Sequence, residues 1–180
     1  EEYLTKKEKL SDLSTQKNEE VIRKLSDQII ELGGKPNLDN SNQKNLIKDL
    51  TKQFDLLSVK IILGDKSKNI IKDETINNTK VRFQKVIDLP SKDLRNLVDN
   101  AKREIGQGVI IIFATKDEKI GLAVGVTDKL TKKFDAVKLA KICSEIVGGK
   151  GGGGRPDFAQ AGGVLKDKIE EAFNKLKSLI

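Results

Sequence analysis

The sequence predicts an α+β (α/β-like) protein in which an antiparallel helical hairpin precedes a small globular domain with a mixed β-sheet and helices. Three observations support this. Apolar residues recur at helical spacing through the first third of the chain, residues 109–114 form a continuous β-rich apolar run, and residues 120–126 alternate apolar residues with glycine or alanine. We place the hairpin in residues 1–68 and the globular domain in residues 69–180.

The hairpin is expected to consist of two long helices, residues 3–32 and 38–63. The stripe of the first is Leu10, Leu13, Ile22, Leu25, Ile29 and Leu32, and Gly33-Gly34-Lys35-Pro36 should end it. The heptad seam of the second is Ile47, Leu50, Phe54, Leu57 and Ile61. A short turn would return the second helix antiparallel to the first. Two alternatives remain open, a self-packed hairpin and a coiled-coil-like arm whose seam meets another chain.

The globular domain is expected to begin after a polar connector, residues 64–78. A strand over residues 80–88 leads to a helix over 92–105 with Ser91 as its N-cap. The apolar run and the alternating segment make a hairpin, and the Gly/Ala face of the second strand would let a helix backbone come close. A helix over 135–147 follows, and Gly162-Gly163 opens a last helix over 165–179.

Composition excludes several functions. The chain has no histidine and one cysteine, so a zinc site with nitrogen and sulfur ligands and a Ser-His or Cys-His nucleophile are excluded. We therefore expect no catalytic residue and no metal ligand. Cys143 is expected to be a buried small apolar side chain in a reducing compartment. No apolar run reaches the ~18 residues of a membrane span. A chain that begins Glu1-Glu2 without methionine is expected to be a piece of a longer protein.

Positive charge is concentrated in residues 129–155. The net charge is +7, and this segment holds seven cationic and two acidic side chains. The cations are Lys129, Lys132, Lys133, Lys138, Lys141, Lys150 and Arg155. Phosphate contacts supply much of the affinity for nucleic acids, so a concentrated cationic patch favours a polyanion partner. Lysines that only solubilise the surface are the alternative.

Residues 148–155 contain six glycines, Lys150 and Arg155. Glycine costs conformational entropy and buries no side chain, so a folded domain keeps such a run where the backbone approaches something closely or adopts positive φ. Free N–H groups in such a loop can hold an anion, and the N-terminus of a following helix would add to this. A flexible linker or a tight structural turn is the alternative. No Gly-Lys-Ser/Thr ends the run, so it is not a P-loop.

Residues 148–163 read Gly-Gly-Lys-Gly-Gly-Gly-Gly-Arg-Pro-Asp-Phe-Ala-Gln-Ala-Gly-Gly. They resemble the signature near the C-terminus of bacterial alanyl-tRNA synthetases, which marks the DHH-associated domain shared with DHH phosphoesterases. The element order over residues 70–180 fits, and the hairpin fits by position. Four glycines precede Arg155 where the family usually has three. The phosphoesterases have histidine at the place of Arg155, and their Asp-His-His motif cannot exist here, which argues against a nuclease or phosphodiesterase.

The resemblance implies a tRNA-binding module without an active site, in an enzyme whose aminoacylation and editing sites lie upstream. No cofactor is expected in this chain, because ATP and zinc would belong to those upstream domains. The implied partners are the outer corner of tRNA(Ala), where the D and T loops meet, the catalytic and editing domains that the module helps to couple, and a second copy bound through the helical arm. The implied location is cytoplasmic, with no membrane partner.

The expected RNA-binding residues are Lys150, Gly151, Gly152, Gly153, Gly154, Arg155, Lys132, Lys133 and Lys141. Those expected to support the loop are Asp157, Gln160, Gly162 and Gly163. Phe158 is expected in the core. The main alternative is an oligomerisation module in which the glycine run is a purely structural turn. A third alternative, the substrate domain of a phosphoesterase, would need an Asp-His-His domain upstream.

Overall fold

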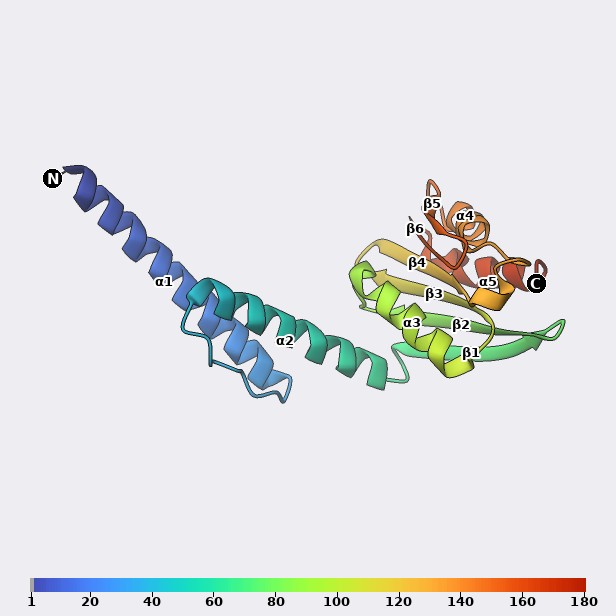
Figure 1. The fold of residues 1–180 in the computed structure, drawn as a ribbon, viewed down its shortest axis with the longest axis horizontal. Helices are drawn as coiled ribbons and strands as arrows, with labels where there is room; N and C mark the ends of the chain where they lie inside the picture. The colour runs from blue at the N-terminus through green and yellow to red at the C-terminus, as the bar shows by residue number, and fades with distance from the viewer. Residues whose placement is uncertain (1) are drawn as a thin grey trace. The chain divides into compact units, whose positions relative to one another are not determined.

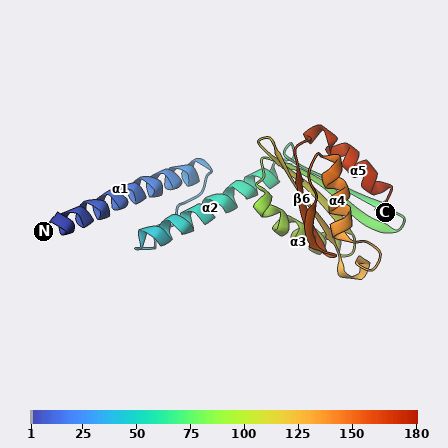
Figure 2. The ribbon, with the colours of Figure 1, turned by 90° about the horizontal axis from the view of Figure 1, so that it is seen from above.

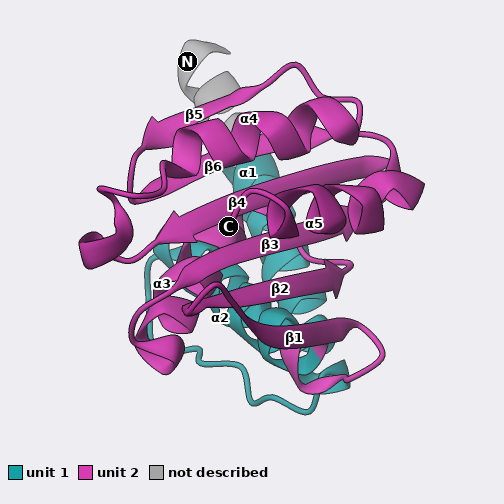
Figure 3. Ribbon diagram, turned by 90° about the vertical axis from the view of Figure 1, so that its right-hand side faces the viewer, with its two compact units in different colours: residues 1–61 teal, residues 62–180 magenta. Residues whose placement is uncertain are grey.

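A computed structural model describes the backbone of residues 2–180 and the side chains from residue 11 onward. The chain divides into two compact units, residues 1–61 and 62–180 (Figure 3). The mixed sheet with helices that the sequence predicts is present in the second unit, and the predicted α+β class is confirmed. Within the described residues, no helix combines the length and the apolar character that a membrane span requires.

The first unit consists of α1 (Glu2–Glu31) and most of α2 (Gln43–Gly64), which run parallel to each other (Figures 1 and 2). The predicted antiparallel hairpin is therefore wrong, because Asn18 lies beside Gln43 and Gly34 lies beside Leu57, and the connection between the helices runs back along α2. Ile29, Leu46 and Leu50 form its buried core. The partly buried side chains around this core are Ile22, Leu25, Phe54 and Leu57. Most of the two predicted stripes therefore pack on each other, but Leu46, which the predicted seam did not include, belongs to the core, and Ile61 remains 47% exposed.

α1 ends as the glycine pair predicts. Gly33 adopts φ +77° and donates its N–H to the carbonyl oxygen of Ile30 at 2.8 Å, and Gly34 donates to Ile29 at 2.8 Å. These bonds satisfy carbonyls that the helix end would otherwise leave without a partner.

The first half of α1 extends past the start of α2. Asn18 Nδ2 donates to Gln43 Oε1 at 3.2 Å, which sets the first residue of α2 beside Asn18 (Figure 2). Residues 11–17 are all exposed, Leu13 among them. The side chain of Leu10, also predicted to belong to the stripe, lies outside the described residues.

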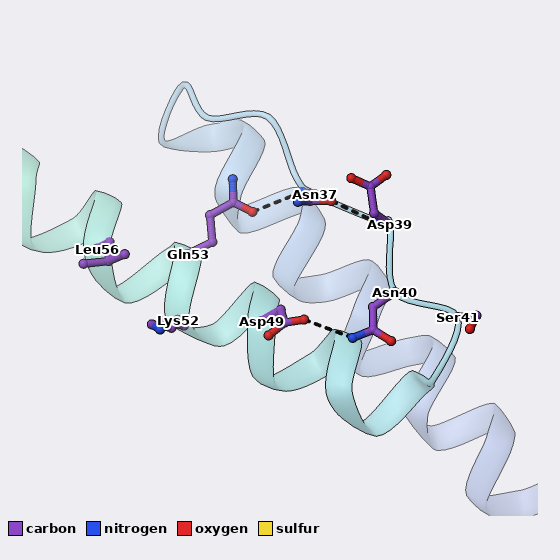
Figure 4. Close-up of a pocket in the computed structure, with 8 residues that line it drawn as sticks. All are labelled: Asn37, Asp39, Asn40, Ser41, Asp49, Lys52, Gln53 and Leu56. Carbon is purple, nitrogen blue, oxygen red and sulfur yellow. Dashed lines mark hydrogen bonds between the residues drawn. The ribbon is translucent and has the colours of Figure 1, made fainter.

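The connection between α1 and α2 is longer than the predicted short turn, because α2 begins at Gln43 rather than near residue 38. Polar side chains hold it against α2 (Figure 4): Asn37 donates its N–H to Gln53 Oε1 at 3.1 Å, and Asn40 Nδ2 donates to Asp49 Oδ2 at 3.2 Å. An open hollow of about 660 Å³ beside it is lined by Asn37, Asp39, Asn40, Ser41, Asp49, Lys52, Gln53 and Leu56. The polar side chains that line the hollow therefore serve to hold the connection against α2.

The second unit is built on a six-stranded sheet in the order β1-β2-β3-β4-β6-β5. The strands are β1 (Asn69–Ile76), β2 (Thr79–Ile87), β3 (Val109–Lys116), β4 (Lys119–Val126), β5 (Gly152–Arg155) and β6 (Phe158–Gly163). Only β2 and β3 run parallel, and α3 (Leu94–Ile105) connects them. The other neighbouring pairs are antiparallel.

Helices cover both faces of this sheet (Figure 2). The helices α4 (Ala136–Ile146) and α5 (Ile169–Lys177) pack on the face that carries Ile111 and Phe113. Phe173 of α5 meets Phe113 edge to face, with ring centroids 5.2 Å apart. On the opposite face α3 lies against the small residues of β4, and a Cβ added at Gly125 would overlap Val98. The predicted close approach of a helix to the Gly/Ala face is thus confirmed.

The predicted connector contains a strand. β1 occupies residues 69–76 and pairs antiparallel with β2 through the turn Asn77-Asn78, whose φ values are +46° and +62°. Two consecutive positive φ angles are what a two-residue hairpin turn requires, and asparagine tolerates them. β1 was missed because it is an edge strand whose side chains are mostly exposed and polar.

Two predicted helix starts are wrong. Ser91 makes no capping bond, because residues 91–93 form a 3₁₀ turn and α3 begins at Leu94. Gly162-Gly163 ends β6 and does not open the last helix, which begins at Ile169 after a 3₁₀ turn over Lys166–Lys168. Gly163 lacks a side chain because a Cβ there would lie 2.6 Å from the carbonyl oxygen of Val147.

One buried cation lies near the β1 edge. Arg82 is 8% exposed and donates from Nε and Nη2 to the two carboxylate oxygens of Asp73, both at 2.8 Å, and from Nη1 to Glu104. The bonds from Arg82, more than its charge, lower the pKa of Asp73. Such an arrangement satisfies a buried guanidinium and needs no ligand.

Candidate nucleic-acid interface

The second half of the glycine-rich run is a strand rather than a loop. Residues 152–155 form β5, which lies at the edge of the sheet and pairs antiparallel with β6 (Figure 3). All four residues of β5 are exposed. The expected side-chain-free surface therefore exists, but it is the flank of a strand and not a nest of N–H groups at a helix start.

The fold itself requires several of these glycines. Gly148 and Gly151 adopt φ +75° and +96°, a region that other residues rarely enter. A Cβ at Gly149 would overlap the carbonyl oxygen of Gly162 and the hydroxyl of Ser144. A Cβ at Gly152 would lie 2.5 Å from that of Ala161, and one at Gly154 would lie 2.6 Å from Ala159 Cα. Part of the glycine pattern thus serves internal packing.

Ser144, on the last turns of α4, ties the segment together. It is fully buried, and its hydroxyl donates to the carbonyl oxygen of Gly162 at 2.7 Å and accepts the N–H of Gly151 at 3.2 Å. Its own carbonyl oxygen accepts the N–H of Gly149 at 2.7 Å. One side chain therefore fixes the start of β5 against the end of β6.

Arg155 lies at the other end of β5. Its side chain is 66% exposed, and Nε lies 3.2 Å from Asp157 Oδ1. Lys102 Nζ donates to the main-chain oxygen of Asp157 at 2.8 Å, which connects the turn to α3. Asp157 thus orients Arg155 while the guanidinium remains open to solvent.

The structure brings Lys132 and Lys133 to the same end as Arg155. They belong to the segment between β4 and α4, and both ends of that segment bond to the turn at Pro156-Asp157. Val126 N–H donates to Asp157 at 2.9 Å, and Ala136 N–H donates to Pro156 at 3.0 Å. Lys132 and Lys133 are exposed.

The remaining predicted residues are more dispersed. Lys150 precedes the opposite end of β5, and Lys141 lies on the exposed face of α4. Gln160 is half-buried on β6, opposite Gly153 in the register. Phe158 is 8% exposed, so its predicted place in the core is confirmed. Cys143 is fully buried as predicted, and burial raises the pKa of its thiol to about 12, which makes it unreactive.

Sequence reasoning missed the cations that α3 brings to this end. Lys102 and Arg103 of α3 line an open hollow of about 620 Å³ together with Lys129, which the predicted cationic segment included, and with Gly106, Gln107, Thr127 and Asp128. Arg95 of α3 places its guanidinium 4.9 Å from the centre of the Phe158 ring. These residues lie far from the glycine run in sequence, so only the fold reveals that they are neighbours. Among the described side chains, no group of three or more potential ligands is placed to hold a metal ion.

Comparisons with known proteins agree with this architecture. The family model of the DHHA1 domain matches residues 78–180. The alanine–tRNA ligase of Hyphomonas neptunium is 44% identical over 107 residues, which cover 59% of this chain and 12% of that protein. That of Fusobacterium nucleatum is 40% identical over 146 residues, which cover 80% of this chain and 17% of that protein. The chain thus spans less than a fifth of these curated relatives.

A solved structure is similar as well. The crystal structure of the C-Ala domain from Aquifex aeolicus alanyl-tRNA synthetase is 30% identical, with a TM-score of 0.57. The similarity covers 60% of this chain and 96% of that one.

Proposed function

We propose that this chain is a tRNA-binding module for the outer corner of tRNA(Ala). The chain belongs to the DHHA1 domain family, in the form found in the C-terminal C-Ala region of alanyl-tRNA synthetases. Its partners would be that corner and the catalytic and editing domains of the same enzyme. By holding one tRNA, the module would help aminoacylation and editing to act on the same molecule.

One observation carries the proposal: an exposed, nearly side-chain-free strand has a cation at each end. Lys150 precedes β5 and Arg155 ends it. At ~3.3 Å per residue β5 extends roughly 10 Å from Gly152 to Arg155, and Lys150 lies two residues before its start. A chain of phosphates can follow such a strand closely, and cations at both ends would fix its position without reading its sequence.

Arginine suits this role better than lysine at the turn. Its planar guanidinium can bind two phosphate oxygens or stack on a base, and Asp157 holds it in place before the RNA arrives. Lys132, Lys133 and Lys141 would add a salt-sensitive background.

The test is a salt titration of tRNA(Ala) binding to the 180-residue chain. Arg155→Ala and Lys150→Ala should each weaken binding and reduce the slope of log K against log salt by roughly one ion or less, because each removes one phosphate partner. Lys80→Ala is the matched control, since Lys80 is exposed and lies on β2, from which three other strands separate β5. If the affinity and the slope of both test variants equal those of the unmodified chain, β5 is not the binding surface.

A pure oligomerisation module is the competing function. It is favoured by the internal contacts at Gly149, Gly152 and Gly154, which explain those glycines without RNA. It is also favoured by the exposed Leu13 on the part of α1 that extends past α2. Sedimentation combined with RNA binding separates the two, because a dimer that binds no RNA would support the competing function.

A further inference from the structure

Gly153 differs from the other glycines of the run. Its φ lies outside the left-handed region, and a Cβ added to it would meet no atom within 4 Å. Its neighbours Gly152 and Gly154 have no such room. Glycine inside a strand weakens it, because it buries no side chain and loses more conformational freedom on folding than alanine. The free chain would therefore be at least as stable with alanine at this position.

The pleat of the sheet places Gly153 on a defined face. Gly153 pairs with Gln160 and Arg155 pairs with Phe158, so these four residues point to one side of the sheet. It is the side on which α3 packs, since Arg95 of α3 lies over the Phe158 ring. The α4 side carries Gly152, Gly154 and their partner alanines, and there the added Cβ atoms would clash.

On its own face α3 leaves β5 uncovered and covers β6 only in part. It packs on β3 and β4, with Leu94 and Val98 meeting the glycines of β4. Gly153 and Arg155 are exposed beyond it, and Gln160 is half-buried. Arg95 is also exposed, at the border between α3 and this open area.

We infer that this area, formed by Gly153, Arg155, Gln160 and Arg95, is where a sugar–phosphate backbone lies directly on the protein main chain. The inference rests on the proposed tRNA-binding function and gives it a specific contact. The missing side chain of Gly153 lets the RNA approach the strand. The two guanidinium groups hold phosphates on either side, and the Gln160 amide is placed to bond a ribose hydroxyl.

The test is Gly153→Ala in the 180-residue chain, with tRNA(Ala) binding measured across a salt series and thermal unfolding measured alongside. The added methyl would separate the RNA backbone from the main chain of β5, so the affinity for tRNA(Ala) should fall about tenfold. The slope against salt should not change, because no charge is removed. The Tm should stay level or rise. Gly64→Ala is the matched control, since it also adds a methyl into open space, and it should leave binding unchanged.

Arg95→Ala gives an independent measurement on the same area. It should weaken binding and lower the salt slope as Arg155→Ala does, although Arg95 lies on α3 and outside the glycine run.

The outcomes separate this inference from the proposed function. If Arg155→Ala and Lys150→Ala weaken binding while Gly153→Ala and Arg95→Ala do not, the tRNA module stands and the contact at Gly153 is wrong. A lower Tm for Gly153→Ala would also overturn the contact, since the fold would then require that glycine. If the unmodified chain binds no tRNA, both proposals fail.

Discussion

At the scale of single residues, neighbouring glycines in one run have different causes. Gly151 is set by its positive φ, Gly149 by the atoms around it, and Gly153 by neither. The sequence cannot distinguish them, because the cause lies in the contacts and the dihedral angle. The structure shows that each of these glycines is present for a different reason, so each can be tested by its own substitution.

Gly149→Ala should destabilise the second unit without any direct role in binding. Its methyl would overlap Gly162 and Ser144, and Ser144 is fully buried with its hydroxyl already bonded. Overpacking of this kind costs about 2 kcal/mol, and thermal or urea unfolding measures it. Gly153→Ala is the paired control, and equal stability of the two variants would contradict these assignments.

Local sequence also limits how much of the site can be predicted. Lys150 and Arg155 could be identified because they interrupt the glycine run itself. Lys102 could not, because its contact with Asp157 joins residues 55 positions apart. Arg95 is equally remote from Phe158 in sequence. In the sequence alone, a lysine or arginine on a helix is interpreted as an ordinary solvated side chain. Only the fold shows that it lies beside the turn at Pro156-Asp157.

At the scale of elements, strong periodicity was predictive and weak periodicity was not. The run in β3 is buried on both faces and the α4 stripe faces the core, as their spacing predicts. β1 and β5 were missed as strands because both lie at sheet edges, where one face or both are exposed and burial no longer imposes an apolar pattern. The Asn77-Asn78 turn was the available signal for β1.

The start of α4 offers a prediction about an element. Asp135 accepts the N–H of Val137 at 2.8 Å and so caps this helix. Asp135→Ala should lower the free energy of unfolding by about 1 kcal/mol, because that N–H loses its partner. Ser91→Ala is the matched control, since the Ser91 hydroxyl makes no capping bond to α3. A larger loss for Ser91→Ala in urea unfolding would contradict the observed caps.

At the scale of the whole molecule, the two units have cores of very different size. The first buries Ile29, Leu46 and Leu50, with four partly buried side chains around them. The second buries a continuous core between the sheet and two helices, including the interlocked rings of Phe83, Phe113 and Phe173. Since burial of apolar area is the main favourable term in folding, the second unit should be much the more stable.

The rates of amide hydrogen exchange should therefore fall into three groups. The central strands β3 and β4 should exchange slowest, because their bonds open only when the whole second unit unfolds. Amides around Ile29 and Leu50 should exchange faster, since opening the small core of the first unit exposes little apolar surface. Residues 11–17 of α1 should exchange fastest, because all are exposed and extend past the start of α2. Strong protection of residues 11–17 at low and high protein concentration alike would contradict this order. Protection that appears only as concentration rises would instead show that a second copy covers this part of α1.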